Sequence, residues 1–210
     1  MLYMYIVAAC GAVISVVVTL VTKLNFFYVS LFTMLAILAV VLVDGAVATV
    51  ARLLPKGCAN HESKVYVVSK EEKKFYENIK IRKWKDKIPE MGHFTGFRKN
   101  KLADPKSLEY VERFLLESCY GEIGHFFSCF VGFVILLFYP ISEIWLAVSI
   151  PVAIINIFMN LPSLLILRYN SYKLRVLRNS LEKKKNRAKQ AEQEEAKDET
   201  KEDPQTLAEN

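Results

Sequence analysis

Four long apolar stretches dominate the chain, at residues 3–22, 26–50, 123–139 and 144–167. Each is close to the roughly 17 to 25 residues that a helix needs to cross a bilayer, and a helix satisfies its own backbone hydrogen bonds in lipid. Short connections join the first stretch to the second and the third to the fourth. The pattern therefore predicts an all-α integral membrane protein with four transmembrane helices arranged as two hairpins.

Polar residues separate the two predicted hairpins and follow the second one. The chain thus divides into an N-terminal transmembrane hairpin (1–51), an insert (52–121), a C-terminal transmembrane hairpin (122–170) and a charged tail (171–210), which turns acidic from Glu192 onward and is expected to be disordered at its end. Lys and Arg crowd residues 52–113 and the tail, whereas the turn at residues 140–143 has none. Because cytoplasmic segments carry the excess of Lys and Arg, the insert and both termini are predicted to be cytoplasmic.

The insert carries an amphipathic stretch at residues 71–88, where aromatic and Ile side chains recur at helical spacing among Lys and Arg residues. Such a helix suits the headgroup layer of a membrane, and the alternative is a solvated face packed on a small core. Residues 64–68 are apolar and β-branched, which is compatible with a strand or with a membrane-touching extension. Asp104 and Pro105 are typical of an N-cap and a first helical position, so a helix is expected to begin there and continue into the third span.

Composition and missing motifs exclude several classes of protein. The 210 residues are 52% hydrophobic with a formal net charge of +6, but the basic residues adjoin the spans and are mixed with acidic ones, which argues against nucleic acid as a partner. The HxxxxD spacing of glycerolipid acyltransferases, a GxSxG elbow and a phosphate-binding glycine loop do not occur. The four Cys residues lack the spacing of a disulfide framework or a CxxC metal site.

The motif Glu122-Ile-Gly-His125 places two ionisable side chains where a polar segment runs into the third apolar stretch. Residues three apart are neighbours on a helix, and ionisable groups in a membrane span are costly, so the pair is a candidate functional site. The alternatives are a structural role for His125 and a metal site. A metal would need more ligands, and His61 and His93 are the only other histidines, so no metal is predicted.

Several segments together resemble one family of bacterial membrane enzymes. They are residues 81–89 (Ile-Arg-Lys-Trp-Lys-Asp-Lys-Ile-Pro), the Glu122-Ile-Gly-His125 motif, Asn160-Leu-Pro with the Leu-Arg-Tyr-Asn of residues 167–170, and Arg52-Leu-Leu-Pro55. In this order and placement, residues 52–174 resemble the glycosyl-4,4'-diaponeurosporenoate acyltransferase family. The resemblance implies a multi-pass enzyme of the bacterial cell membrane that moves a fatty acyl chain onto a hydroxyl of a carotenoid glycoside or a related glycolipid.

Acylation of a hydroxyl needs a base to accept its proton, and the unperturbed pKa of His, about 6.5, suits this task near neutral pH. His125 is therefore the candidate catalytic base, and Glu122 the acid expected to hold its imidazole in the right tautomer. Asn160 is expected either to stabilise the developing oxyanion or to form an interhelical hydrogen bond. Asp44, inside the second span, is expected to bind substrate or to pair with a polar group.

Basic and polar side chains near the predicted cytoplasmic face are candidates for substrate binding. They can bind the phosphates of an acyl donor, such as acyl-CoA or acyl carrier protein, or the headgroups of anionic lipids. The residues concerned are Arg82, Lys83, Trp84, Lys85, Lys87, Arg168 and Asn170. The donor is a co-substrate, so no cofactor is predicted, and the expected partners are membrane lipids, the donor and the glycosylated lipid acceptor.

A non-catalytic membrane scaffold or a small transporter is the rival interpretation, in which the same polar residues bond the helices together or line a proton path. Such a path would need polar residues distributed along a pore. Glu122, His125, Asp44 and Asn160 instead gather towards one side of the predicted bundle. That distribution favours chemistry at the membrane surface.

Overall fold

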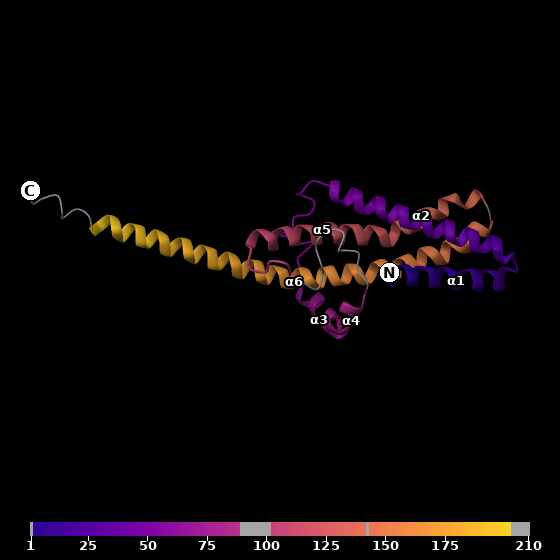
Figure 1. Ribbon diagram of the computed structural model, residues 1–210, viewed down its shortest axis with the longest axis horizontal. Coiled ribbons are helices and arrows are strands. Elements are labelled where there is room, and N and C mark those ends of the chain that lie inside the picture. Colours follow the sequence, from indigo (N-terminus) through magenta and orange to yellow (C-terminus); the bar gives the residue numbers. More distant parts are fainter. Residues whose placement is uncertain (1, 89–101, 142, 203–210) are drawn as a thin grey trace, which may run out of the picture.

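The computed structural model describes residues 2–88, 102–141 and 143–202, and within them every regular element is a helix. Four long helices form a bundle: α1 (Leu2–Thr22), α2 (Phe26–Leu53), α5 (Leu108–Val131) and α6 (Glu143–Glu202) (Figure 1). Shorter elements are α3 (Lys70–Asn78), α4 (Ile81–Trp84) and η1 (Lys85–Lys87) in the insert, and the 3₁₀ helix η3 (Gly132–Ile141) after α5.

The long helix α6 is the centre of the bundle, since it packs against α1, α2, α5 and η3. A core of apolar side chains joins these elements, with Ile14 of α1, Val29 of α2, Ile135 of η3 and Val148 of α6 all buried. The indole nitrogen of Trp145 donates to the carbonyl oxygen of Ile135 at 2.7 Å, which fixes the start of α6 against η3.

The outer surfaces of the bundle are apolar, and all four long helices are long and apolar enough to cross a membrane. Only 22% of the most apolar window of α2 is buried inside the protein, so most of its side chains need lipid around them. Leu31, Leu38 and Leu42 are among these outward side chains. The prediction of an all-helical protein is confirmed for the described residues, which include four helices long and apolar enough to span a membrane.

The third span departs from the expected continuous helix. The α-helix ends at Val131, and residues 132–141 continue as the tighter 3₁₀ helix. Gly132 lies against Asn156 of α6, where an added Cβ would come within 2.8 Å of the amide nitrogen Nδ2. Glycine at this point therefore lets the change of helix type take place in close contact with α6.

The helix that leads into the third span begins three residues later than predicted. The carboxylate of Asp104 accepts hydrogen bonds from the backbone N–H groups of Lys106 and Ser107, which forms a turn instead of a helix start. Ser107 is the N-cap, and its hydroxyl oxygen accepts from the N–H of Tyr110 at 3.2 Å.

The amphipathic stretch of the insert forms three short helices instead of one. Lys80 adopts a left-handed conformation (φ 52°) after α3 and turns the chain before α4 begins. This turn allows the buried side chains of Tyr76 and Ile81 to pack against Ile166 and Tyr169 of α6. The apolar face of the stretch is thus turned to the protein, in agreement with the alternative of a face packed on a core.

Residues 64–66 form turns, residue 67 is a bend and residue 68 has no regular structure, so the strand considered from the sequence does not form here. The hydroxyl of Tyr66 donates to the carbonyl oxygen of Cys58 at 2.7 Å, which closes this loop. Its ring packs with Cys119 and Tyr120 of α5. The loop therefore belongs to the packed part of the insert.

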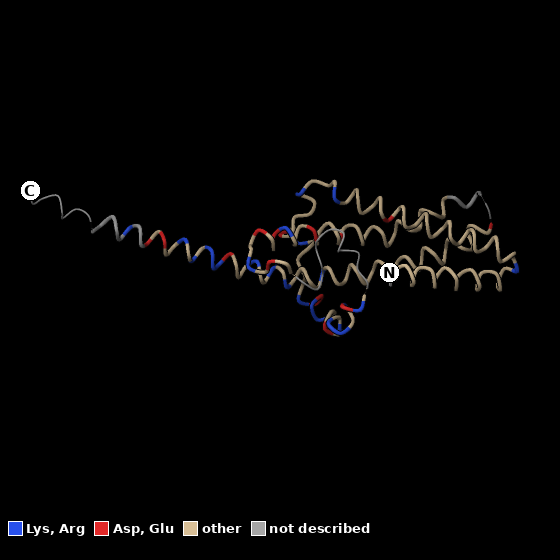
Figure 2. The backbone as a smooth tube through the Cα atoms, viewed as in Figure 1, with Lys and Arg blue, Asp and Glu red and all other residues tan. Residues whose placement is uncertain are grey.

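The last helix, α6, is 60 residues long and extends far beyond the bundle (Figure 1). Acidic and basic residues alternate along the extension (Figure 2). The helix continues through the acidic part of the tail to Glu202, because residues 183–202 contain no Gly or Pro and are rich in strong helix formers. Residues 203–210, the end of the predicted tail, lie outside the described residues.

Candidate active site

Three helices converge on a group of hydrogen-bonded polar side chains, here called the Asn160 cluster: Asp44 of α2, His125 of α5, and Asn156 and Asn160 of α6. The side-chain oxygen Oδ1 of Asn160 lies 2.8 Å from Nδ1 of His125, and its amide nitrogen Nδ2 donates to Oδ2 of Asp44 at 3.1 Å. The same nitrogen lies 3.0 Å from Oδ1 of Asn156. Each side chain is thus bonded to another, as polar groups inside a membrane bundle require.

Asn156 completes the cluster from one helical turn before Asn160. Its amide nitrogen donates to the backbone oxygen of Ser128 at 2.9 Å and lies 3.4 Å from Oδ1 of Asp44. Both carboxylate oxygens of Asp44 therefore face amide N–H groups of α6. Of the two roles expected for Asp44, the structure displays the pairing with polar groups.

The hydrogen bonds of Asn160 determine where His125 carries its proton. Because Nδ2 of Asn160 is turned to Asp44 and Asn156, the atom facing His125 is the carbonyl oxygen, which can only accept. The ring nitrogen Nδ1 of His125 is therefore the donor. A neutral imidazole then keeps its lone pair on Nε2, and within the described residues no group bonds to that nitrogen.

The length of α2 places the cluster relative to the membrane. About 27 Å of helix separates Phe26, next to the turn at Lys23, from Asp44, and the hydrocarbon core of a bilayer is about 30 Å thick. A hydrocarbon core that begins at Phe26 would therefore end near Asp44, on the insert side. Arg52, about 12 Å further along the helix, lies beyond that edge, where its guanidinium is 3.7 Å from the carboxylate of Glu117.

The close contact at Gly132 gives a direct test of the Asn160 cluster. We expect Gly132→Ala to push the amide of Asn156 away from Ser128 and Asp44 and to lower the free energy of unfolding by about 1 to 3 kcal/mol. Gly45→Ala is the matched control, since a Cβ there meets nothing within 4 Å. Thermal denaturation of both variants in one detergent measures the difference, and equal stabilities would contradict the tight packing of Asn156.

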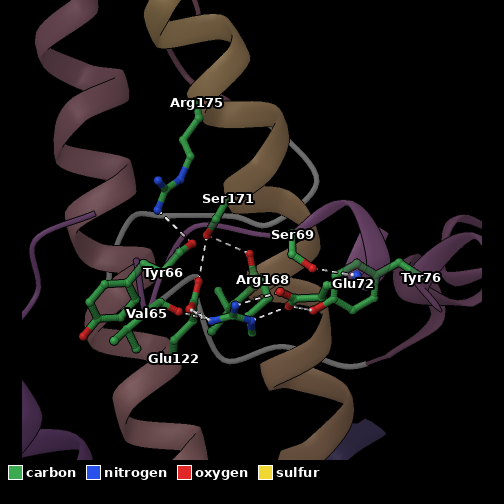
Figure 3. Close-up of polar contacts among 10 residues, drawn as sticks. Val65, Tyr66, Ser69, Glu72, Tyr76, Glu122, Arg168, Ser171 and Arg175 are labelled. Atoms are coloured by element: carbon green, nitrogen blue, oxygen red, sulfur yellow. Dashed lines mark hydrogen bonds and ion pairs between the residues drawn. The ribbon is translucent and has the colours of Figure 1, made fainter. Parts of the chain in front are cut away.

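A second polar group, the Arg168 clamp, lies on the insert side of the bundle and consists of Glu72, Glu122, Arg168 and Ser171 (Figure 3). The guanidinium of Arg168 binds both carboxylate oxygens of Glu72, at 2.5 and 2.9 Å. Its third nitrogen donates to Oε2 of Glu122 at 3.1 Å, and the Ser171 hydroxyl donates to Oε1 of Glu122 at 2.8 Å. The clamp thus fastens α3 of the insert to α5 and α6.

Glu122 does not orient His125, contrary to the expectation from their spacing. Residues three apart on a helix differ in direction by about 60°, so the two side chains meet α6 at different turns. Glu122 faces Ser171 and Arg168, whereas His125 faces Asn160. The carboxylate that reaches His125 is that of Asp44, through Asn160.

The clamp residue that the insert contributes, Glu72, is ionised at neutral pH. Burial opposes the ionisation of Glu72, but hydrogen bonds from Arg168 and Tyr76 and the charge of Arg168 outweigh it and lower the pKa of Glu72 below its usual range. Burial and the neighbouring Glu72 raise the pKa of Tyr76. At neutral pH Glu72 therefore carries its charge, and the Tyr76 hydroxyl keeps the proton that it donates to Glu72.

The sequence profile of the glycosyl-4,4'-diaponeurosporenoate acyltransferase family matches residues 61–180, more than half of the chain. The chain belongs to this family. The resemblance seen in its motifs is thereby confirmed. No curated protein and no solved structure matches the chain. The region that matches the family contains His125, Asn160 and the whole Arg168 clamp, whereas Asp44 lies outside it.

The substrate-binding residues predicted from the sequence do not form a single site. Arg168 has its three guanidinium nitrogens bonded in the clamp, where one of them also donates to the backbone oxygen of Val65 at 3.0 Å. The ammonium of Lys85 lies 3.4 Å from Oδ1 of Asn170. The indole nitrogen of Trp84 donates to the backbone oxygen of Ile79 at 3.0 Å. The exposed members of the set, all on the insert, are Arg82, Lys83 and Lys87.

Three contributors to these clusters were not predicted: Glu72, Asn156 and Ser171. Asn156 had a usable signal, since it lies one helical turn before Asn160 within an apolar span. Glu72 and Ser171 had none, because both lie in polar segments where Glu and Ser are common. Glu72 gains its partner where the insert packs against α6, and Ser171 gains its partner where α5 packs against α6.

Metal ligands were considered from the sequence because of the three histidines. Among the described residues, no three His, Cys, Asp or Glu side chains gather in a way that could hold a metal ion. His61 lies in the insert, where burial and the charge of Arg175 lower its pKa. His93 and Pro89 lie outside the described residues.

Proposed function

We propose that this protein transfers a fatty acyl chain from a thioester donor to a hydroxyl of a glycosylated lipid at the cytoplasmic face of the bacterial cell membrane. Family membership supports acyl transfer and a carotenoid glycoside as the class of acceptor. The observation that carries the mechanism is the hydrogen-bonded series from Asp44 through Asn160 to His125. It leaves Nε2 of His125 as the nitrogen that can accept a proton.

The reaction proceeds by direct attack of the acceptor hydroxyl. As the hydroxyl oxygen attacks the thioester carbonyl carbon, Nε2 of His125 accepts its proton and a new C–O bond forms. The tetrahedral oxyanion then collapses, the C–S bond breaks, and the imidazolium returns the proton to the departing thiolate. The products are an O-acyl ester and the free thiol, so protons and electrons balance without a further reactant.

Asn160 and Asp44 act in this reaction as positioning residues. The amide hydrogens of Asn160 are directed to Asp44 and Asn156, so we assign it the orientation of His125 and not the stabilisation of the oxyanion. Asp44 holds the Asn160 amide in the orientation that requires a hydrogen on Nδ1. The arrangement uses an amide between acid and imidazole to select the tautomer needed for a base.

The exposed cations of the insert supply the proposed donor site. Arg82, Lys83 and Lys87 lie on the surface of the segment that the Arg168 clamp holds against α6. Acyl-CoA and acyl carrier protein both carry phosphate, which such cations attract. The excess of Lys and Arg on this side supports a cytoplasmic insert and cytoplasmic termini, where both donors are made.

The rival is a non-catalytic scaffold or a small transporter. A scaffold accounts for the interhelical bonds of the Asn160 cluster but not for an imidazole whose second nitrogen has no bonded partner among the residues that the structure describes. A proton path needs ionisable side chains along the spans, whereas most charged residues of the bundle gather on its insert side (Figure 2). Both observations favour the enzyme.

Lipid analysis tests the proposed function. The full chain is produced in a bacterium that makes a glycosylated carotenoid but has no gene for this family, and its lipids are compared with those of cells carrying the empty vector. We expect an additional species heavier by one fatty acyl group, from which mild alkali releases the fatty acid. Absence of any acylated species, with both acceptor and protein present in the membrane, would favour the rival.

A further inference from the structure

An apolar groove lies along the bundle between α1, α2 and α6, and its empty space, which is partly open to the surroundings, is about 430 Å³. On α1 it is lined by Tyr3, Val7, Cys10 and Ile14, a stripe at spacings of three and four residues that follows one face of the helix. This stripe covers about 16 Å of helix, close to the thickness of one leaflet of the hydrocarbon core. The groove is thus as long as a lipid chain in one leaflet.

The two ends of the groove differ in polarity. At one end Asn156 lines it, and the amide of that residue belongs to the Asn160 cluster. At the other end Ile14 is buried in the apolar core with Val152, which also lines the groove. An occupant with one polar and one apolar end would therefore lie with its polar end next to the cluster.

We propose that this groove holds the fatty acyl chain of the donor, with its carbonyl at the Asn160 cluster and its methyl end at Ile14. The proposal rests on the proposed function and adds to it a site for the acyl chain. Most of that site lies outside the region that matches the family, since α1 and α2 precede residue 61. The acyl specificity then depends on α1 and α2, which precede the matched region.

The shape of the groove favours an unbranched alkyl chain over the polyene of the acceptor. A carotenoid backbone is rigid and carries methyl branches, whereas the groove is narrow: at Gly11, next to it, α1 approaches α2 so closely that an added Cβ would lie 2.9 Å from Cδ1 of Ile37. An acyl chain that enters from lipid leaves surroundings as apolar as the groove. The groove therefore contributes little affinity but selects chain length through the fit against the buried side chains of Ile14 and Val152.

Chain-length preference tests the proposal. Cys10→Phe places a large ring in the middle of the groove, and Val13→Phe places the same ring on the outer face of α1, where Val13 is 62% exposed. In membranes supplied with octanoyl-CoA and stearoyl-CoA, we expect Cys10→Phe to lower the stearoyl-to-octanoyl ratio in the acylated product by about tenfold or more. Val13→Phe should leave the ratio of the unsubstituted protein unchanged.

The outcomes separate the groove from the proposed function. Wild-type acylation with an unchanged ratio in Cys10→Phe would overturn the groove while leaving the enzyme intact, whereas no acylation by the wild type would overturn both. Stearoyl-CoA with a photoreactive diazirine at its methyl end provides a second measurement on the unsubstituted protein. Its label should fall on the peptide that contains Ile14, and labelling confined to the insert would also overturn the groove.

Discussion

Replacement of His125 by alanine is expected to lower the rate of acyl transfer by a factor of about 10² to 10⁴, the usual contribution of a positioned general base. The reason is that Nε2 of His125 is the nitrogen left to accept the hydroxyl proton once Nδ1 is bonded to Asn160. The measurement is the initial rate of ester formation in membranes that contain equal amounts of wild-type and variant protein. In the His125→Ala variant, Asn160 keeps its hydrogen bonds to Asp44 and Asn156, so the protein should still insert into the membrane.

His61→Ala is the matched control, because His61 lies in the insert and has no contact with the Asn160 cluster among the described interactions. It should retain the wild-type rate.

Asp44→Asn separates positioning from acid–base chemistry. Its amide can turn a nitrogen towards Asn160 and weaken the preferred tautomer, so we expect a slower rate and an altered pH profile, not complete loss. Full activity of His125→Ala would remove His125 from the mechanism.

The positions of the membrane spans could be predicted because lipid imposes a length and a composition on each helix. Residues 3–22 and 26–50 correspond closely to α1 and α2 for that reason. The ends of α5 could not be predicted in the same way. The start depends on whether Asp104 caps a helix or forms a turn, and the change to 3₁₀ geometry at Gly132 depends on a contact with Asn156 that is distant in the sequence.

The residues of the candidate site were easier to predict than their partners. Asp44, His125 and Asn160 stand out because each is a polar side chain within an apolar span. Placing such a side chain in a membrane is energetically costly, so each one is a candidate functional residue. Their pairing depends on the rotation of α2, α5 and α6 relative to one another, which the spacing within one helix does not determine. The i, i+3 spacing therefore suggested a bond between Glu122 and His125, whereas packing directs the two side chains to separate groups.

Arg168→Ala is expected to destabilise the protein by about 3 kcal/mol, because it leaves the carboxylate of Glu122 buried without its cation. The Glu122 side chain is only 4% exposed, so water cannot replace the lost guanidinium. Glu72 is 24% exposed and can be solvated, and its loss of Arg168 should contribute less. The free energy of unfolding is measured by SDS titration in mixed micelles. Arg82→Ala, at an exposed cation of the insert, should change it by less than about 0.5 kcal/mol.

A double-substitution cycle distinguishes a lost ion pair from lost packing. Arg168→Leu should destabilise the protein strongly, whereas combining it with Glu122→Leu should recover about 2 kcal/mol, because no uncompensated charge is then buried. The recovered stability need not restore catalysis, since the clamp also holds α3 and the exposed cations of the insert against α6. If the two substitutions were simply additive, Glu122 and Arg168 would not be coupled in the clamp.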